Sequence, residues 1–123
     1  MTVTELIAVA TKLAVPFAPS DDCSSGDVAA ALITTAGHVF TGVCLDTECG
    51  LGFCAEHSAI AEMLKARECQ IEMIVAVDHR GQVMSPCGRC RELIWQVADS
   101  NRDTMVVLGP EHCVRLVDLL PFR

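Results

Sequence analysis

Two short cysteine blocks contain the residues of this chain that are best suited to chemistry. The first is Cys54-Ala55-Glu56 and the second is Pro86-Cys87-Gly88-Arg89-Cys90. Thiolates from Cys54, Cys87 and Cys90 can hold a zinc ion and leave its fourth position open for water. Glu56, two residues beyond the first ligand, offers a carboxylate that can move the protons of that water. The spacing therefore predicts a catalytic zinc site with Glu56 as its proton shuttle.

Each of these residues also has a simpler interpretation. Cys87 and Cys90 have the spacing of a redox pair as well as that of a zinc half-site. Glu56 could be an ordinary glutamate in the first turn of a helix, where the helix dipole favours a negative charge. Three thiolates around Zn²⁺ leave a net negative charge, so His57, Arg89 and Arg91 are candidate donors to the sulfurs. A surface salt bridge or a helix cap would explain those three equally well.

The elements that must position these residues follow from the hydrophobic pattern. Helical spacing predicts helices over residues 3–14, 54–66 and 86–98, and short apolar runs predict strands over 28–34, 39–43, 71–77 and 105–108. Residues 20–27 and 44–53 are predicted to be loops, and 114–120 a short strand followed by a helical turn. Strands that alternate with helices imply partly parallel pairing. We expect one domain over residues 1–123, built as a three-layer α/β/α sandwich.

Composition narrows the class of protein. Hydrophobic residues make up 51% of the 123 residues, which is enough for a core and for an oligomer interface. The formal charge of −7 disfavours nucleic acid as a partner, because nucleic-acid binding depends on Lys and Arg. No signal peptide or membrane helix is evident in the pattern. We therefore expect a cytoplasmic protein with no membrane partner, whose eight cysteines bind metal or stay reduced.

The motifs resemble those of the cytidine deaminase superfamily. The similar segments are residues 29–32, 40–42 and 118–121 together with the two metal blocks, Cys54 to Ile60 and Ser85 to Arg91. The all-cysteine ligand set resembles the small homotetrameric branch, which includes blasticidin S deaminase. The resemblance implies a five-stranded mixed sheet, zinc on Cys54, Cys87 and Cys90, and Glu56 as proton shuttle. The implied reaction is the hydrolytic loss of ammonia from a cytosine nucleoside.

The stretch after the second predicted strand departs from that family. Free-nucleoside deaminases of this branch usually carry Asn-x-Glu-Asn there, which grips the ribose, whereas this chain has Cys44-Leu45-Asp46-Thr47. By the resemblance, Cys44, Asp46 and Ala55 are the candidates for substrate binding. Two substrates stay open, namely cytidine or deoxycytidine and a modified aminopyrimidine nucleoside such as blasticidin S. The other classes that we considered are a nucleic-acid-editing deaminase and a zinc or redox module without catalysis.

Overall fold

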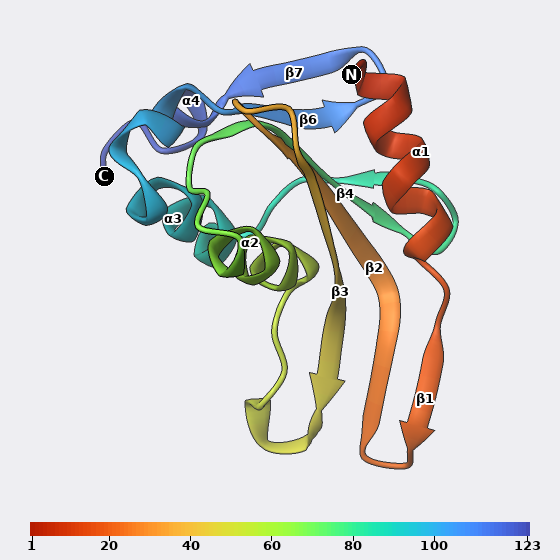
Figure 1. Ribbon diagram of the computed structural model, residues 1–123. Coiled ribbons are helices and arrows are strands. Elements are labelled where there is room, and N and C mark those ends of the chain that lie inside the picture. The colour runs from red at the N-terminus through yellow and green to blue at the C-terminus, as the bar shows by residue number, and fades with distance from the viewer.

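A mixed β-sheet lies between helices in the computed structural model, which describes residues 1–123 (Figure 1). Its seven strands are β1 (Phe17–Ser20), β2 (Cys23–Thr34), β3 (Val39–Thr47), β4 (Ile71–Asp78), β5 (Val83–Met84), β6 (Met105–Gly109) and β7 (His112–Arg115). The helices are α1 (Val3–Leu13), α2 (Ala55–Lys65), α3 (Gly88–Val97) and the short α4 (Leu116–Leu119). β4 and β6 pair in parallel, and all other pairs are antiparallel.

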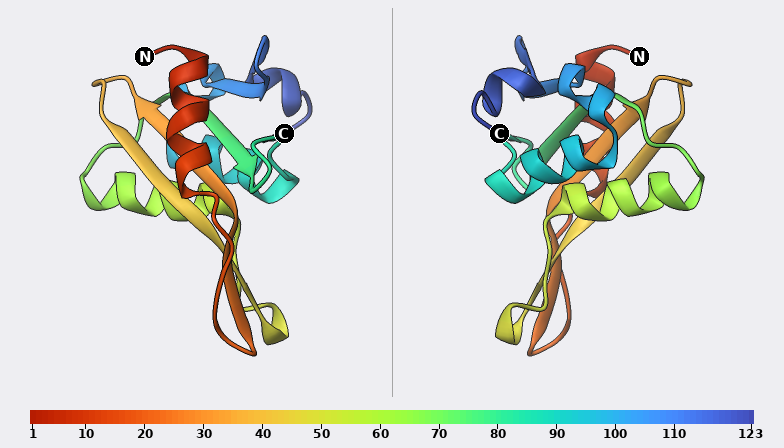
Figure 2. Two further views of the ribbon diagram at one scale, coloured as in Figure 1. Left: turned by 90° about the vertical axis from the view of Figure 1, so that its right-hand side faces the viewer. Right: turned by 90° about the vertical axis from the view of Figure 1, so that its left-hand side faces the viewer.

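The two faces of the sheet are covered by different helices, as Figures 1 and 2 show for α1 on one face and for α2 and α3 on the other. Neighbouring residues of a strand point to opposite faces. Ala29 and Ala31 of β2 accordingly pack with Leu6 of α1, whereas Ala30 and Leu32 lie in the core on the side of α2 and α3. The predicted three-layer sandwich is confirmed. No helix has the length and apolar character needed to cross a bilayer.

The sheet is larger than the five strands that we expected. β5 pairs with only two residues of β4, and β1 pairs with the beginning of β2. The predicted loop over 20–27 is wrong, because β2 already begins at Cys23 and pairs there with β3. The predicted loop over 44–53 is wrong in its first part, because β3 continues to Thr47. These polar strand ends are stabilised by main-chain hydrogen bonds to distant segments of the chain. The periodicity of the side chains therefore does not indicate that they are strands.

These strand ends form an arm that projects beyond the helices (Figures 1 and 2). The arm consists of β1, the first part of β2 and the end of β3. It contains a bulge in β2, where Gly26 has a left-handed φ of +86°. A Cβ on Gly26 would lie 2.1 Å from the carbonyl oxygen of Val15, so the close approach also requires glycine. The arm leads directly to the residues in front of α2.

A buried asparagine connects α3 to the sheet. The side-chain amide of Asn101 donates to the carbonyl oxygens of Ile94 at 3.0 Å and of Cys69 at 2.9 Å. Its side-chain oxygen accepts a hydrogen bond from the backbone N–H of Ile71 at 2.9 Å. Asn101 is only 1% exposed, so these groups have no water to replace the bonds. The last turn of α3 is thereby fixed relative to the start of β4.

A close approach of α2 to β3 fixes the helix that begins at the first cysteine block. A Cβ added to Gly42 of β3 would lie 2.4 Å from the backbone nitrogen of Ala59 and 2.6 Å from the hydroxyl oxygen of Ser58. Backbone atoms cannot move aside as a flexible side chain can. The absence of a side chain at Gly42 therefore sets the distance between α2 and the sheet.

We expect Gly42→Ala to lower the free energy of unfolding by about 1–3 kcal/mol, because an inserted methyl group forces helix and strand apart. Gly109→Ala is the matched control, since its added Cβ would meet only the Cβ of His112 at an ordinary 3.8 Å. Urea denaturation of both variants measures the difference. Equal stability of the two variants would contradict the proposed tight contact.

Candidate metal centre

Both cysteine blocks lie at the start of a helix, as the sequence indicated. Cys54 is the N-cap residue of α2, and Cys87 is the N-cap residue of α3. Cys90 lies one turn into α3 and is fully buried. The positive ends of two helix dipoles therefore point at the same place, which favours thiolates there. Pro86 precedes the cap residue and is not itself part of the helix, in contrast to the predicted start.

The sulfur atoms of the three cysteines are neighbours. The Sγ of Cys87 lies 3.6 Å from the Sγ of Cys54 and 3.5 Å from the Sγ of Cys90. Tetrahedral zinc with bonds of about 2.3 Å to sulfur requires sulfur separations of about 3.8 Å. The donor set therefore fits zinc in both its chemistry and its spacing.

His57 contributes a fourth possible donor. Its Nδ1 lies 3.6 Å from the Sγ of Cys90, and the ligating atoms of Cys54, His57 and Cys90 all lie within 4.8 Å of one another. Partial burial, and secondarily the charge of Arg89, lowers the pKa of His57. The ring is therefore close enough either to bind a metal or to donate a hydrogen bond to a thiolate.

The three thiols differ in pKa because their surroundings differ. Burial raises the pKa of Cys54 and raises that of Cys90 far more. Burial also acts on Cys87, but backbone N–H groups at the start of α3 and the neighbouring thiols outweigh it, so the pKa of Cys87 is lowered. Cys87 is thus the thiol that ionises most readily before a metal ion arrives.

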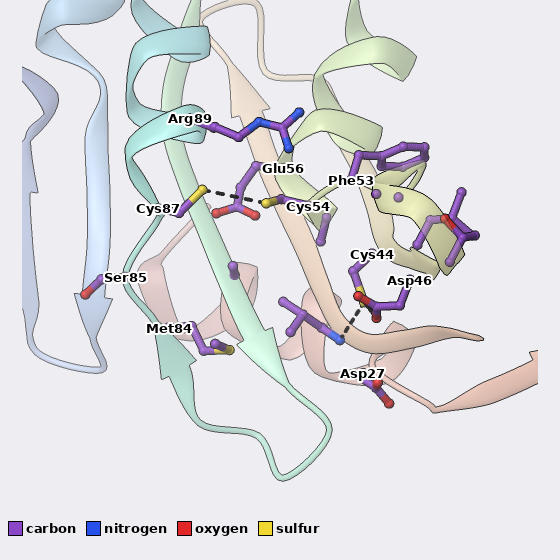
Figure 3. A pocket seen from close by; sticks show the side chains of 17 residues that line it. Asp27, Cys44, Asp46, Phe53, Cys54, Glu56, Met84, Ser85, Cys87 and Arg89 are labelled. Atoms are coloured by element: carbon purple, nitrogen blue, oxygen red, sulfur yellow. Dashed lines mark hydrogen bonds between the residues drawn. The ribbon is translucent and has the colours of Figure 1, made fainter. Parts of the chain in front are cut away.

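The carboxylate of Glu56 lies beside these sulfurs. Glu56 is 5% exposed in the first turn of α2, and Figure 3 shows its carboxylate close to Cys54 and Cys87. Burial raises the pKa of Glu56, while its own backbone N–H and the Cys90 thiol oppose this shift. A buried carboxyl group whose pKa is raised toward neutrality is suited to accept and return protons.

A pocket of about 470 Å³ opens in front of these groups. Of the residues singled out from the sequence, it is lined by Cys44, Asp46, Cys54, Ala55, Glu56, Cys87 and Arg89. Arg91 lies apart from it, because its Nε donates to the carbonyl oxygen of Pro86 at 2.9 Å and holds the loop before α3. His57 and Cys90 lie behind the pocket wall.

Sequence reasoning missed part of the pocket lining. Asp27, Phe53, Met84 and Ser85 also line the pocket and are labelled in Figure 3. Phe53 and Ser85 directly precede the two metal blocks, so their proximity in the chain was a usable signal. Asp27 had none, since it reaches the pocket only through the bulge of β2 and its pairing with β3.

Comparison with known proteins places this geometry in a family. The model for the cytidine and deoxycytidylate deaminase zinc-binding region matches residues 4–107. A cytidine deaminase from Mycobacterium tuberculosis is 32% identical over 95 residues, which cover 76% of this chain and 69% of that protein. The chain belongs to the cytidine and deoxycytidylate deaminase family.

Solved structures of the family have the same fold. A crystal structure of cytidine deaminase from Mycobacterium tuberculosis superposes with a TM-score of 0.82 at 27% identity, covering 99% of this chain and 96% of that one. Cytidine deaminase from Burkholderia pseudomallei gives a TM-score of 0.79 at 30% identity, with coverage of 99% and 98%. The predictions of a deaminase fold, of enzymatic deamination and of zinc as cofactor are confirmed.

We expect the purified protein to contain about one zinc ion per chain, and Cys87→Ala to lose most of it together with stability, because ligation is coupled to folding. His57→Gln should retain zinc, since it leaves all three thiolates in place. Cys69→Ala is the control, because Cys69 is exposed and lies outside the pocket lining. Elemental analysis and thermal denaturation measure both effects. Zinc lost from His57→Gln but retained by Cys87→Ala would overturn this ligand set.

Proposed function

We propose that this protein is a zinc-dependent hydrolytic deaminase that converts a cytosine nucleoside to its uracil form and releases ammonia. The observation that carries the proposal is the buried Glu56 carboxylate in the wall of an open pocket, beside the neighbouring sulfurs of three cysteines. The matching relatives are cytidine deaminases, which favours cytidine or deoxycytidine over a modified nucleoside such as blasticidin S.

The proposed ligands of the zinc are Cys54, Cys87 and Cys90. Three protein ligands leave a position for water, whereas His57 as a fourth ligand would close the site. His57 would then donate a hydrogen bond from Nδ1 to the Cys90 thiolate, and Arg89 would lower the net negative charge from the pocket side. Zinc held in this way would supply a Lewis acid that generates hydroxide near neutral pH.

Glu56 would move the protons of the reaction. Its carboxylate takes a proton from the attacking water and delivers it to the ring nitrogen next to the reacting carbon. The proton of the hydroxyl group now on the ring carbon then passes through Glu56 to the amino group, the carbon–nitrogen bond breaks as the carbonyl forms, and ammonia leaves. Burial keeps this carboxylate away from bulk water, so the proton is passed between the reacting groups.

The opposite end of the pocket suits an uncharged sugar. Asp27 and Asp46 lie there, whereas Arg89 lies at the metal end (Figure 3). Carboxylates accept hydrogen bonds from hydroxyl groups and repel phosphate. We therefore propose a nucleoside and not a nucleotide as substrate, with Asp46 as an acceptor for a sugar hydroxyl and Ala55 in the wall beside the base.

The loss of ultraviolet absorbance on deamination tests this function directly. We expect cytidine and deoxycytidine to be converted, and deoxycytidylate to be converted at least tenfold less efficiently, because a repulsion of about 1.4 kcal/mol already gives that factor. Blasticidin S serves as the competing substrate. Zinc-loaded protein that converts none of the cytosine nucleosides would refute the proposal, and efficient turnover of deoxycytidylate would refute its nucleoside preference.

We expect Glu56→Gln to lower kcat by about 10²–10⁴-fold and to leave zinc content and fold unchanged, because it removes the proton carrier alone. Glutamine keeps the size of the side chain, so the pocket is preserved. Glu62→Gln is the control on the same helix, since Glu62 is exposed and lies outside the pocket lining. If Glu56→Gln turns over substrate near the wild-type rate, Glu56 is not the proton carrier and only stabilises the first turn of the helix.

We also propose a homotetramer in the cytoplasm. Several large apolar side chains are exposed on the arm and near the pocket rim, among them Phe17 at 64% and Leu51 at 76%, and Phe122 is fully exposed. Copies of the chain would cover such a surface. All eight cysteines are free, which is typical of a reducing compartment.

Sedimentation at micromolar concentration tests the assembly. We expect a single species of four chains, because exposed apolar side chains such as Phe17 and Leu51 are stabilised when partner chains cover them. Leu51→Asp should weaken the assembly, whereas Glu111→Gln, on an exposed turn away from the arm, should not. A fully active wild-type monomer at this concentration would contradict the tetramer.

A further inference from the structure

One residue of β3 faces a bulge of β2 at the edge of the pocket. The register between the two strands pairs Ser25 with Leu45 and then Ala29 with Val43. Residues 26–28 of β2 therefore lie opposite the single residue Cys44. Such a bulge interrupts the ladder and leaves main-chain groups without their usual partners. Some other group must satisfy them, because this region is half-buried or buried.

Cys44 supplies such a partner for Val28 and a second link to β2 through Ser25. Its Sγ accepts a hydrogen bond from the backbone N–H of Val28 at 3.3 Å, and its carbonyl oxygen accepts one from the hydroxyl of Ser25 at 2.8 Å. The same thiol lies 3.7 Å from a carboxylate oxygen of Asp46, to which it can donate. Cys44 is only 7% exposed, so its sulfur is shielded from water, whereas the side chain of Asp46 reaches the open side of the pocket and is exposed.

These contacts converge on the sugar end of the pocket. Asp27 and Val28, which the bulge presents, line the pocket together with Asp46 and Cys44 itself. Figure 3 shows Cys44 beside the carboxylate of Asp46, and the hydrogen bond from Val28 reaches the same sulfur. A thiol is both a weak donor and a weak acceptor, so it can serve both neighbours at once. Cys44 does not touch the metal cysteines, and it therefore has a separate task.

We propose that Cys44 is a positioning residue for recognition of the substrate sugar, an inference that rests on the proposed nucleoside deaminase function. Its S–H group orients the carboxylate of Asp46 toward a sugar hydroxyl, and its sulfur holds the bulge that forms the facing wall. Specificity for the hydroxyl then depends on a thiol that does not contact the reacting atoms. By the resemblance, Cys44 was a candidate for substrate binding in the place of an asparagine, and its contacts with Val28 and Asp46 now indicate an indirect role.

The test uses Cys44→Ala, Cys44→Ser, Asp46→Asn and the double variant Cys44→Ala/Asp46→Asn, with Cys69→Ala as a control outside the pocket. Steady-state kinetics are measured with cytidine and with its 2′-, 3′- and 5′-deoxy analogues. Equilibrium binding of uridine, zinc content and thermal denaturation are measured in parallel. A hydroxyl-specific effect separates orientation of Asp46 from a general loss of stability.

We expect Cys44→Ala to raise KM for cytidine by about threefold to tenfold, the range of one modest hydrogen bond, and to affect KM more than kcat. The penalty should disappear for one deoxy analogue, the same one for which Asp46→Asn loses discrimination. Serine donates and accepts as cysteine does, so Cys44→Ser should stay within about twofold of wild type. The double variant should be no worse than Asp46→Asn, because the two residues act as one unit.

Three results would overturn the inference: an unchanged KM in Cys44→Ala, an equal penalty for all three deoxy analogues, or additive effects in the double variant. If Cys44→Ala does not fold, Cys44→Val, which fills the space without a donor, takes its place and carries the same expectations. Wild-type protein that is full of zinc but inactive on every cytosine nucleoside would instead refute the proposed function. If the wild-type protein is active and the Cys44 variants have the same kinetics as wild type, only this inference is refuted and the proposed function stands.

Discussion

The convergence of three cysteine sulfurs on one point is the constraint that the rest of this structure must satisfy. The sulfur atoms lie 3.5–3.6 Å apart along the chain of contacts from Cys54 through Cys87 to Cys90. Three thiolates at this spacing would repel one another and would coexist only beside positive partners, namely the proposed zinc ion and the N-terminal ends of helices. Two helices must therefore begin at the same place on one face of the sheet. The packing of α2 and α3 side by side meets that requirement.

Two small features make this arrangement rigid. Gly42 allows the backbone of α2 to approach β3, and Asn101 connects the end of α3 to the start of β4. Neither residue touches the site, yet both fix the distance between the helix starts. A displacement of about 1 Å at a reacting group can cost about two orders of magnitude in rate. The positions of the helices at these two contacts are therefore tightly restricted, whereas the arm is exposed and weakly packed.

How much the sequence could predict depends on how local each feature is. The metal blocks and their helices follow from short-range signals, because the cap residue, the ligand spacing and the carboxylate all lie within a few residues. The polar beginning of β2 has the composition of a loop, since its strand character comes from pairing with β3 about twenty residues away. The position of Asp27 at the pocket depends on the same pairing, so no local pattern indicates it. Phe53 and Ser85 were accessible in principle, as neighbours of the metal blocks.

The residues proposed for catalysis and those proposed for substrate recognition also come from different elements of the fold. The groups that would act on the base come from the starts of α2 and α3, whereas those proposed to face the sugar come from β2 and β3 at the bulge and next to it. The two sets share the pocket but few contacts, because Cys44 bonds to Val28 and Asp46 and the metal sulfurs contact one another. Changes at the strand ends can therefore alter which sugar is accepted and leave the metal centre intact. Cys44 and Asp46, which stand where the resemblance implies Asn-x-Glu-Asn, would be a change of this kind.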